Sequence, residues 1–149
     1  MHANAAESLL PYLKPGARVL DIGSGSGYLT HVLAELVKPG GTVVGVEHIQ
    51  PLVDIGIQNT RKSEEGRQLM DEGGIKYVRA DGRKGWGEGA PYDAIHVGAA
   101  AAGFHQEMID QLGRPGRYVH VFSSCSDKLR LRSMPWSELT LFCSPTNNR

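Results

Sequence analysis

The strongest constraint on the fold of this chain is the stretch VLDIGSGSGYLTHVLAEL, residues 19–36. An apolar run there passes through three alternating glycines into apolar residues at helical spacing. Glycine adopts backbone angles that other residues resist, and it lets a ligand approach the main chain closely. A glycine-rich turn between a strand and a helix marks the ligand crevice of an open α/β sheet. The stretch therefore predicts a fold class and the place of a binding site together.

The remainder of the chain repeats this alternation of strands and helices. Apolar strand patterns occur at 17–23, 42–47, 75–80, 92–100 and 117–122, and helical patterns at 3–13, 28–37, 51–62 and 104–112. Strands that alternate with helices on short connections form a parallel sheet covered by helices on both faces. We therefore expect an α/β fold of Rossmann-like type, with a parallel sheet flanked by helices.

The strand–helix pattern weakens after Phe122. Residues 123–149 begin with a Ser-rich run, contain the alternating KLRLR and end polar, with no further strand–helix unit. We predict a folded domain over residues 1–122 and a divergent tail over residues 123–149, either poorly ordered or attached as a loose hairpin. The sheet would then lack C-terminal strands.

Composition narrows the class of protein. The 149 residues suit one domain, and 16 basic side chains balance 16 acidic ones, so no net field attracts nucleic acid or an anionic membrane. No apolar run approaches the roughly 20 residues that cross a bilayer. The N-terminus lacks the basic and apolar regions of a signal peptide. Cys125 and Cys143 form no disulfide framework, so we expect a cytoplasmic protein.

The glycine turn disfavours two common classes of ligand. A P-loop requires a lysine and a hydroxyl residue after its last glycine, and Tyr28 and Leu29 stand in those places. A dinucleotide fold requires a third glycine where Tyr28 stands, whereas this chain has it one place earlier, at Gly27. Nucleotide hydrolysis and dehydrogenation are both disfavoured.

The pattern that remains, an acid followed by three alternating glycines, resembles the first motif of class I methyltransferases. These enzymes bind S-adenosylmethionine, whose sulfonium is cationic and which carries no phosphate, so a turn without basic side chains suits it. Glu47 ends the second strand, where an acid can accept hydrogen bonds from ribose hydroxyls. Asp81 and Gly82 end the third strand, where they could read the amino edge of adenine. An exposed strand-end glutamate and a plain Asp-Gly turn are the alternatives.

Further segments make the resemblance specific. VLDIGSGSGYLT, GVEHIQPLV, VRADGRKGW, APYDAIHVGAAA and MIDQLGRPGR resemble the protein-L-isoaspartate O-methyltransferase family in order and spacing. The opening MHA also resembles the end of a segment of that family, and the likeness covers about residues 1–118. Members of the family methylate the free α-carboxylate of isoaspartyl residues in damaged proteins, and the ester then collapses to a succinimide that can reopen as aspartate.

The resemblance implies a set of contacts to S-adenosylmethionine. Gly23, Gly25 and Ser26 would contact the cofactor from the turn, Glu47 and His48 would meet its ribose, Asp81 and Gly82 its adenine, and His2 would lie near it. Asp21 would orient the turn and reach the methionine part through water. The partners would be isoaspartyl proteins and peptides, with no nucleic acid and no membrane, and we expect a monomer.

No catalytic residue and no metal site is predicted. A carboxylate acceptor is already ionised near neutral pH, so the reaction requires no general base. His31 and His105 have no ligand partner at metal spacing, and we expect His96 to be a strand histidine satisfied by backbone groups. Tyr28 and Trp86 flank the crevice and could stack on adenine, but we expect both to pack in the core.

Two departures from the family pattern leave alternatives open. We expect this chain to lack the family's N-terminal segment, which carries a motif serine, and to diverge after about Tyr118. The first alternative is therefore a truncated relative that binds the cofactor without catalysis. The second is another class I methyltransferase that acts on a small molecule or RNA.

Overall fold

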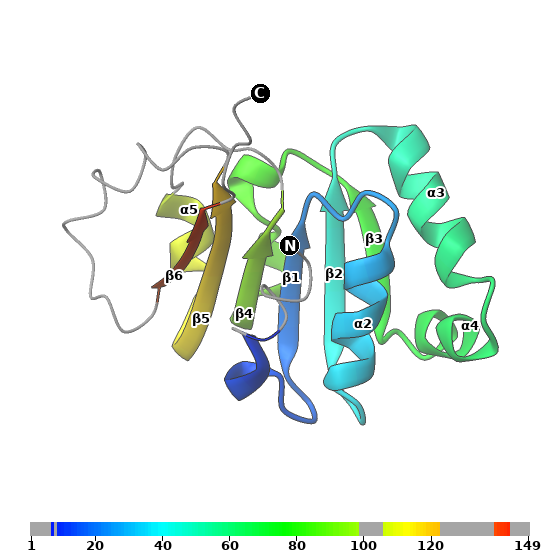
Figure 1. The fold of residues 1–149 in the computed structure, drawn as a ribbon, viewed down its shortest axis with the longest axis horizontal. Coiled ribbons are helices and arrows are strands. Elements are labelled where there is room, and N and C mark those ends of the chain that lie inside the picture. The colour runs from blue at the N-terminus through cyan, green and yellow to red at the C-terminus, as the bar shows by residue number, and fades with distance from the viewer. Residues whose placement is uncertain (1–6, 8, 99–105, 123–138, 144–149) are drawn as a thin grey trace.

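One parallel sheet organises the chain. The computed structural model describes residue 7 and residues 9–98, 106–122 and 139–143. Within these ranges the strands are β1 (Arg18–Ile22), β2 (Thr42–Glu47), β3 (Ile75–Arg79), β4 (Tyr92–Val97), β5 (Leu112–Phe122) and β6 (Leu139–Cys143). They form a six-stranded sheet in the order β3-β2-β1-β4-β5-β6, with every neighbouring pair parallel (Figure 1). The predicted parallel α/β class is confirmed.

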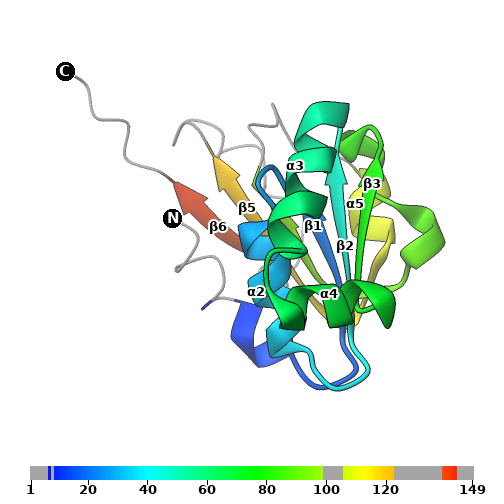
Figure 2. The same ribbon diagram turned by 90° about the vertical axis from the view of Figure 1, so that its right-hand side faces the viewer.

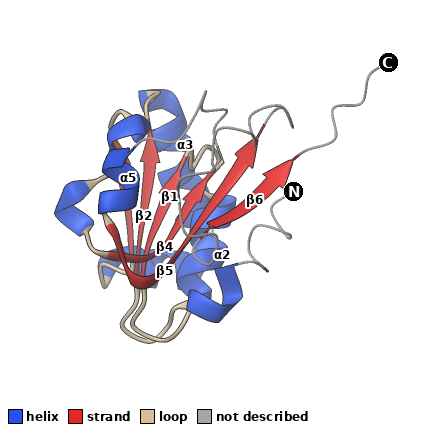
Figure 3. Ribbon diagram, turned by 90° about the vertical axis from the view of Figure 1, so that its left-hand side faces the viewer, coloured by secondary structure: helices blue, strands red, loops and turns tan. Residues whose placement is uncertain are grey.

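Helices cover both faces of this sheet. The described helices are α2 (Tyr28–Leu36), α3 (Gln50–Thr60), α4 (Glu64–Asp71) and α5 (Gln106–Asp110), with short 3-10 helices at Leu10–Tyr12, Gly82–Lys84 and Gly87–Gly89. Figures 2 and 3 show α2 on one side of the sheet and α5 on the other. None of the described helices is long and apolar enough to cross a membrane.

The sequence analysis did not predict α4. The helix begins after Ser63, whose side-chain oxygen accepts a hydrogen bond from the Gly66 amide at 3.0 Å. Glu64 and Glu65 follow in the first turn, where acidic side chains stabilise the positive end of the helix dipole. A serine cap followed by two acids was therefore a readable signal for this helix.

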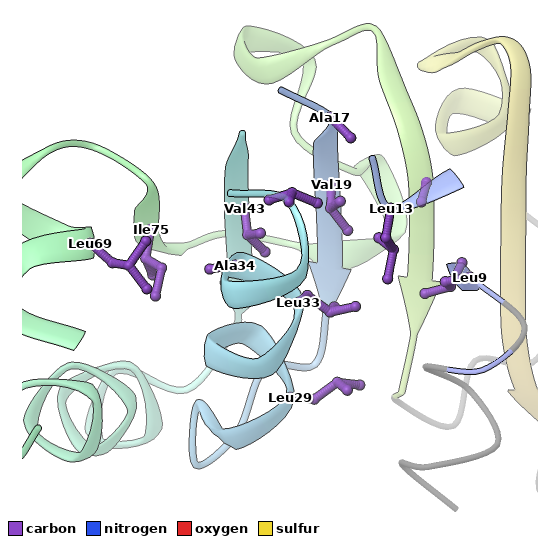
Figure 4. Close-up of a cluster of buried hydrophobic side chains, with 12 residues drawn as sticks. Leu9, Leu13, Ala17, Val19, Leu29, Leu33, Ala34, Val43, Leu69 and Ile75 are labelled. Carbon is purple, nitrogen blue, oxygen red and sulfur yellow. The ribbon is translucent and has the colours of Figure 1, made fainter. Parts of the chain in front are cut away.

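Successive side chains along each strand point to opposite faces of the sheet, so the buried residues form two clusters. Val19 faces the cluster under α2 and α4, while its neighbour Leu20 faces the cluster under α5. Figure 4 shows the first cluster, which consists of Leu9, Leu13, Ala17, Val19, Leu29, Leu33, Ala34, Val37, Val43, Leu69, Ile75 and Ala94. The second consists of Leu20, Ile22, Val44, Val46, Tyr92, Ile95, Val97 and Met108. Burial on both faces explains why these strands read as nearly continuous apolar runs.

The structure corrects one expectation about the C-terminal region. We expected the sheet to lack C-terminal strands, with residues 123–149 poorly ordered or attached as a loose hairpin. Instead, β6 lies inside this range and pairs in parallel with β5 over five residue positions, from Tyr118↔Leu139 to Phe122↔Cys143. Leu139 to Cys143 reads LTLFC, a run of β-favouring residues, and the free edge of β5 offers backbone partners for it. The other residues of the predicted tail lie outside the described ranges.

Parallel register brings the ends of four strands to one edge of the sheet. Ile22 of β1 pairs with Val46 of β2 and with Val97 of β4, and Glu47 pairs with Arg79 of β3. The glycine turn after β1, the acid at the end of β2 and the segment after β3 therefore lie side by side. This carboxyl edge is where open α/β sheets bind ligands.

Candidate functional site

The turn between β1 and α2 depends on glycine at each of its alternating positions. Gly23, Gly25 and Gly27 have φ angles of 80°, 50° and 79°, in the left-handed region that side chains disfavour. At Gly27 a side chain would also collide with the Tyr77 hydroxyl and with the backbone of Gly56. At Gly27 the turn is thus pressed against β3 and α3, and only glycine fits at that position.

A cavity of about 210 Å³ opens between this turn and the end of β4. Its lining residues are Asp21, Gly23, Ser24, Gly25, Ser26, Tyr28, Leu29, His96 and Gly98. No lysine or arginine is among them, as the sequence pattern indicated. Pockets that enclose a whole drug-sized ligand measure roughly 300–1,000 Å³, so this cavity suits one end of such a ligand.

Polar groups of the turn remain available at the cavity. Among the described residues, the amides of Gly25 and Ser26 have no hydrogen-bond acceptor. The Ser24 hydroxyl is buried and has no partner there either. Buried polar groups are normally paired, so the unpaired Ser24 hydroxyl beside a cavity points to a polar ligand. The amides of Gly25 and Ser26 are less buried and are open to the same ligand. The turn is held in place by Asn59 of α3, whose side-chain amide donates to the Ser26 carbonyl at 3.0 Å.

Beneath the turn, a buried carboxylate and a buried imidazole on adjacent strands form a hydrogen bond. Asp21 and His96 are direct partners in the register of β1 and β4, and Nδ1 of His96 lies 2.8 Å from Oδ1 of Asp21. The second oxygen of Asp21 accepts a hydrogen bond from the Thr30 hydroxyl of α2 at 2.6 Å. The side chains of His96 and Asp21 are 3% and 1% exposed. Our expectation that backbone groups satisfy His96 was wrong, because the register places a carboxylate beside the ring.

Asp21 and His96 belong to a row of polar side chains that crosses the sheet and continues to Tyr77 of β3. Gly45 of β2 is the register partner of both Asp21 and Tyr77, and its missing side chain leaves space that the Tyr77 ring fills. The Tyr77 hydroxyl donates to the Gly27 carbonyl at 3.2 Å and lies 2.8 Å from the Thr60 hydroxyl. Burial raises the pKa of Tyr77 above its usual value. Tyr77 therefore supports the glycine turn from below as a neutral hydrogen-bonding group.

Glu47 is buried at the end of β2. Its Oε1 accepts hydrogen bonds from the amides of His48 and Ile49, at 2.8 Å and 3.3 Å, and lies 3.0 Å from Nδ1 of His48. Within the described residues, Oε2 makes no hydrogen bond. The side chain is thus fixed by one oxygen and retains the other as an acceptor.

Asp81 follows β3 and pairs with Arg83. Its two oxygens accept from the Arg83 guanidinium at 2.8–3.2 Å, and Oδ1 also accepts from the Arg83 amide at 3.1 Å. The Arg83 hydrogen bonds lower the pKa of Asp81 to about 2. Gly82 lies against the end of β1, where a side chain would collide with Ile22. The carboxylate is therefore ionised, and a ligand would share it with Arg83.

The predicted residues divide into two groups in space. The first group, Asp21, Gly23, Gly25 and Ser26, lines the cavity. The second lies along the same edge of the sheet, with Glu47 and His48 at the end of β2 and Asp81 and Gly82 after β3. His2 lies outside the described residues. The sequence analysis missed Ser24 and Gly98, and it did not assign His96 to the site.

The two aromatic side chains beside the crevice also differ from each other. Tyr28 is 66% exposed and lines the cavity, so our expectation of core packing was wrong for it. Tyr28 is the first residue of α2, next to the glycine turn and the cavity. Trp86 is partly buried against the second core cluster, as expected.

Sequence comparison finds close relatives in one family. A sequence model described as Protein-L-isoaspartate(D-aspartate) O-methyltransferase (PCMT) matches residues 1–131. Protein-L-isoaspartate O-methyltransferase 2 of Arabidopsis thaliana is 50% identical over 119 residues, covering 80% of this chain and 38% of the relative. The Triticum aestivum protein-L-isoaspartate O-methyltransferase is 45% identical over 131 residues, covering 88% and 56%. The chain spans about half the length of the curated relatives it matches, and the likeness extends past Tyr118, further than expected.

Solved structures show the same likeness in three dimensions. A structure from Plasmodium falciparum, assigned to the protein-L-isoaspartate O-methyltransferases and in complex with S-adenosyl-L-homocysteine, superposes with a TM-score of 0.74 at 29% identity. The match covers 84% of this chain and 60% of that one. A second structure, named as a protein-L-isoaspartate O-methyltransferase, gives a TM-score of 0.67 at 30% identity and covers 78% and 34%.

Proposed function

The chain belongs to the protein-L-isoaspartate O-methyltransferase family, and on that premise we propose that it transfers a methyl group from S-adenosylmethionine to the free α-carboxylate of isoaspartyl residues in damaged proteins. One observation carries the proposal. At the carboxyl edge of the sheet, a cation-free glycine turn with orphaned polar groups lies beside two strand-end acids. This arrangement suits a nucleoside that carries an amino-acid group and no phosphate.

The residues present fit the donor part by part. The amides of Gly25 and Ser26 offer hydrogen bonds to the carboxylate of its amino-acid end, at the start of α2, where the helix dipole favours an anion. Asp21 provides an acidic partner for the ammonium group. Glu47 would accept hydrogen bonds from the ribose hydroxyls through its second oxygen. Asp81 and Gly82 would meet the adenine.

The chemistry demands little proton transfer from the protein. S-adenosylmethionine supplies, when bound, a methyl group on a positively charged sulfur that a carboxylate oxygen can attack, while the electrons of the broken bond stay with the sulfur. An α-carboxylate has an ordinary pKa of about 3.5, so it is ionised at neutral pH and needs no general base. The residues of the chain therefore act by alignment and by excluding water from the cavity.

A paired binding and transfer experiment tests this function. We expect calorimetry to show that the chain binds S-adenosylhomocysteine, and a labelled donor to methylate an isoaspartyl peptide but not the matched aspartyl peptide. Binding without transfer would support the non-catalytic alternative. Transfer only to a small molecule or RNA would support another class I methyltransferase. Absence of binding from the folded chain would overturn the proposed cofactor.

The cellular setting is part of the same proposal. The two cysteines among 149 residues support a reducing compartment, and we place the activity in the cytoplasm. We propose that the chain acts as a monomer on isoaspartyl proteins, without nucleic acid or membrane partners, which the balanced charge supports. Light scattering on the purified chain and localisation of a tagged copy test these two statements.

A further inference from the structure

The hydrogen-bonded pair formed by Asp21 and His96 lies at the candidate site itself. Both side chains are buried, and both line the cavity at the glycine turn. A buried carboxylate needs hydrogen-bond donors on its oxygens, and here each oxygen has one, from Thr30 and from His96. A carboxylate oxygen can accept two hydrogen bonds. Thr30 and His96 can therefore hold the carboxylate while each oxygen still accepts a hydrogen bond from a ligand.

The hydrogen bond to Asp21 also fixes the state of the histidine ring. A carboxylate only accepts hydrogen bonds, so the proton between the two side chains belongs to Nδ1 of His96. Within the described residues, Nε2 has no hydrogen-bond partner. The orientation of the ring is therefore set by one hydrogen bond, from Nδ1 to Asp21.

The absence of a side chain at position 98 leaves room for the His96 ring. A side chain at Gly98 would stand 2.9 Å from Cε1 of His96 and 3.7 Å from Nδ1. Because the ring is buried, it could not swing away from such a group without losing Asp21. The end of β4 is thus shaped around the ring, in contact with the cavity that Gly98 also lines.

From these contacts we propose that His96 is a positioning residue for donor binding: through Nδ1 it holds the Asp21 carboxylate at the cavity, where that carboxylate receives the ammonium group of the donor's amino-acid end. The proposal rests on the proposed function and deepens it. His96 does not itself contact the reacting atoms. Its effect is confined to ligands that possess the amino-acid group.

Two substitutions of His96 by amide side chains test which ring nitrogen is required. In His96→Asn, the side-chain amide nitrogen occupies the place of Nδ1 and can still donate to Asp21. In His96→Gln, the amide nitrogen lies nearer the place of Nε2 and leaves Asp21 without this donor. His31→Gln is the matched control, since His31 lies on α2 and its one side-chain partner among the described residues is Glu35, at 3.6 Å.

The readout compares two ligands by calorimetry. S-adenosylhomocysteine has the amino-acid group, and 5′-methylthioadenosine is the same nucleoside thioether without it. A hydrogen bond to a charged group is worth about 1.5–3 kcal/mol, so we expect His96→Gln to weaken S-adenosylhomocysteine binding about tenfold or more. We expect His96→Asn and His31→Gln to stay near wild type, and methylthioadenosine to bind all four proteins alike.

The outcomes distinguish this inference from the proposed function. If wild type binds neither ligand, the proposed function fails. If wild type binds S-adenosylhomocysteine but His96→Gln binds it equally well, or loses both ligands in parallel while remaining folded, the positioning role is wrong. Loss of binding in a folded His96→Asn protein would also overturn the role, because that variant retains the donor.

A measurement on wild type covers the case in which His96→Gln does not fold. Nitrogen NMR of labelled histidine reports which ring nitrogen carries the proton. We expect a protonated Nδ1 for His96, and a shift on adding S-adenosylhomocysteine that methylthioadenosine does not reproduce. An unprotonated Nδ1, or equal responses to the two ligands, would contradict the inference.

Discussion

Asp21 of β1 and His96 of β4 are 75 residues apart in the chain, yet they are direct register partners whose side chains meet at 2.8 Å beneath the glycine turn. With Thr30 above and Tyr77 two strands away, they form a buried polar row on the α2 face of an otherwise apolar sheet. Buried polar networks hold a defined arrangement when their charged groups are hydrogen-bonded, and here both oxygens of Asp21 have a donor. The row therefore explains how a glycine-rich turn can keep a defined shape.

Removal of the Thr30 hydroxyl is expected to destabilise the fold. In Thr30→Val, the shape is retained but Oδ2 of Asp21 loses its donor at 2.6 Å. A hydrogen bond to a charged group is worth about 1.5–3 kcal/mol, and we expect the free energy of unfolding to fall by that amount. Urea unfolding followed by circular dichroism measures it.

Thr60→Val is the matched comparison for that prediction. Thr60 is equally buried, but its hydroxyl faces the neutral Tyr77 hydroxyl, which also donates to the Gly27 carbonyl. A neutral hydrogen bond contributes about 0.5–1.5 kcal/mol. If Thr60→Val costs as much as Thr30→Val, the charge on Asp21 is not the source of the stabilisation.

The close approach at Gly27 can be separated from its backbone angle. Gly27 and Gly40 have nearly the same φ, 79° and 78°, but a side chain at Gly40 would meet nothing within 4 Å. Gly40→Ala should cost only the left-handed strain of about 1–2 kcal/mol. Gly27→Ala should cost about 1–3 kcal/mol more, because Tyr77 and Gly56 must move. Equal losses in thermal or urea unfolding would show that the packing around the turn is loose.

Glu47→Gln is expected to weaken donor binding through the ribose. The amide retains an oxygen for the amides of His48 and Ile49 but removes the charge that would face the ribose hydroxyls. We expect both S-adenosylhomocysteine and methylthioadenosine to bind about tenfold more weakly, the loss that one charged hydrogen bond implies. Calorimetry measures it, with Glu65→Gln on the exposed face of α4 as control. A loss confined to S-adenosylhomocysteine would place Glu47 at the other end of the donor.

The titration of Asp81 should report its pairing with Arg83. The pKa of Asp81 is lowered from 3.8 to about 2 by the Arg83 hydrogen bonds, so any stabilisation from this pair is present above about pH 4 and is lost as pH falls toward 2. In Arg83→Ala, we expect the pKa to return toward 3.8. Carbon NMR of the carboxyl group follows the titration, with Asp54, whose partner is Gln50, as reference. An unchanged Asp81 titration in the variant would mean that Arg83 does not hold this carboxylate in solution.

Local patterns were sufficient to predict much of this molecule. The glycine turn, the strands on either side of it and the acids Glu47 and Asp81 were recognisable because strand and helix periodicities are short-range properties of the chain. The position of the acids also followed, since the carboxyl ends of parallel strands share one edge. The cap at Ser63 was readable in the same way, although its helix was not predicted.

Only the tertiary structure decided which side chains meet at the site. Nothing near Asp21 or His96 in the sequence indicates that β1 and β4 are adjacent in a register that opposes these two residues. The burial of Ser24 and the exposure of Tyr28 likewise depend on how α2 lies over the sheet. Strand order and register come from the sum of many contacts between distant parts of the chain, each weak alone. Local residue patterns therefore determine the helices and strands, and packing determines which side chains meet at the site.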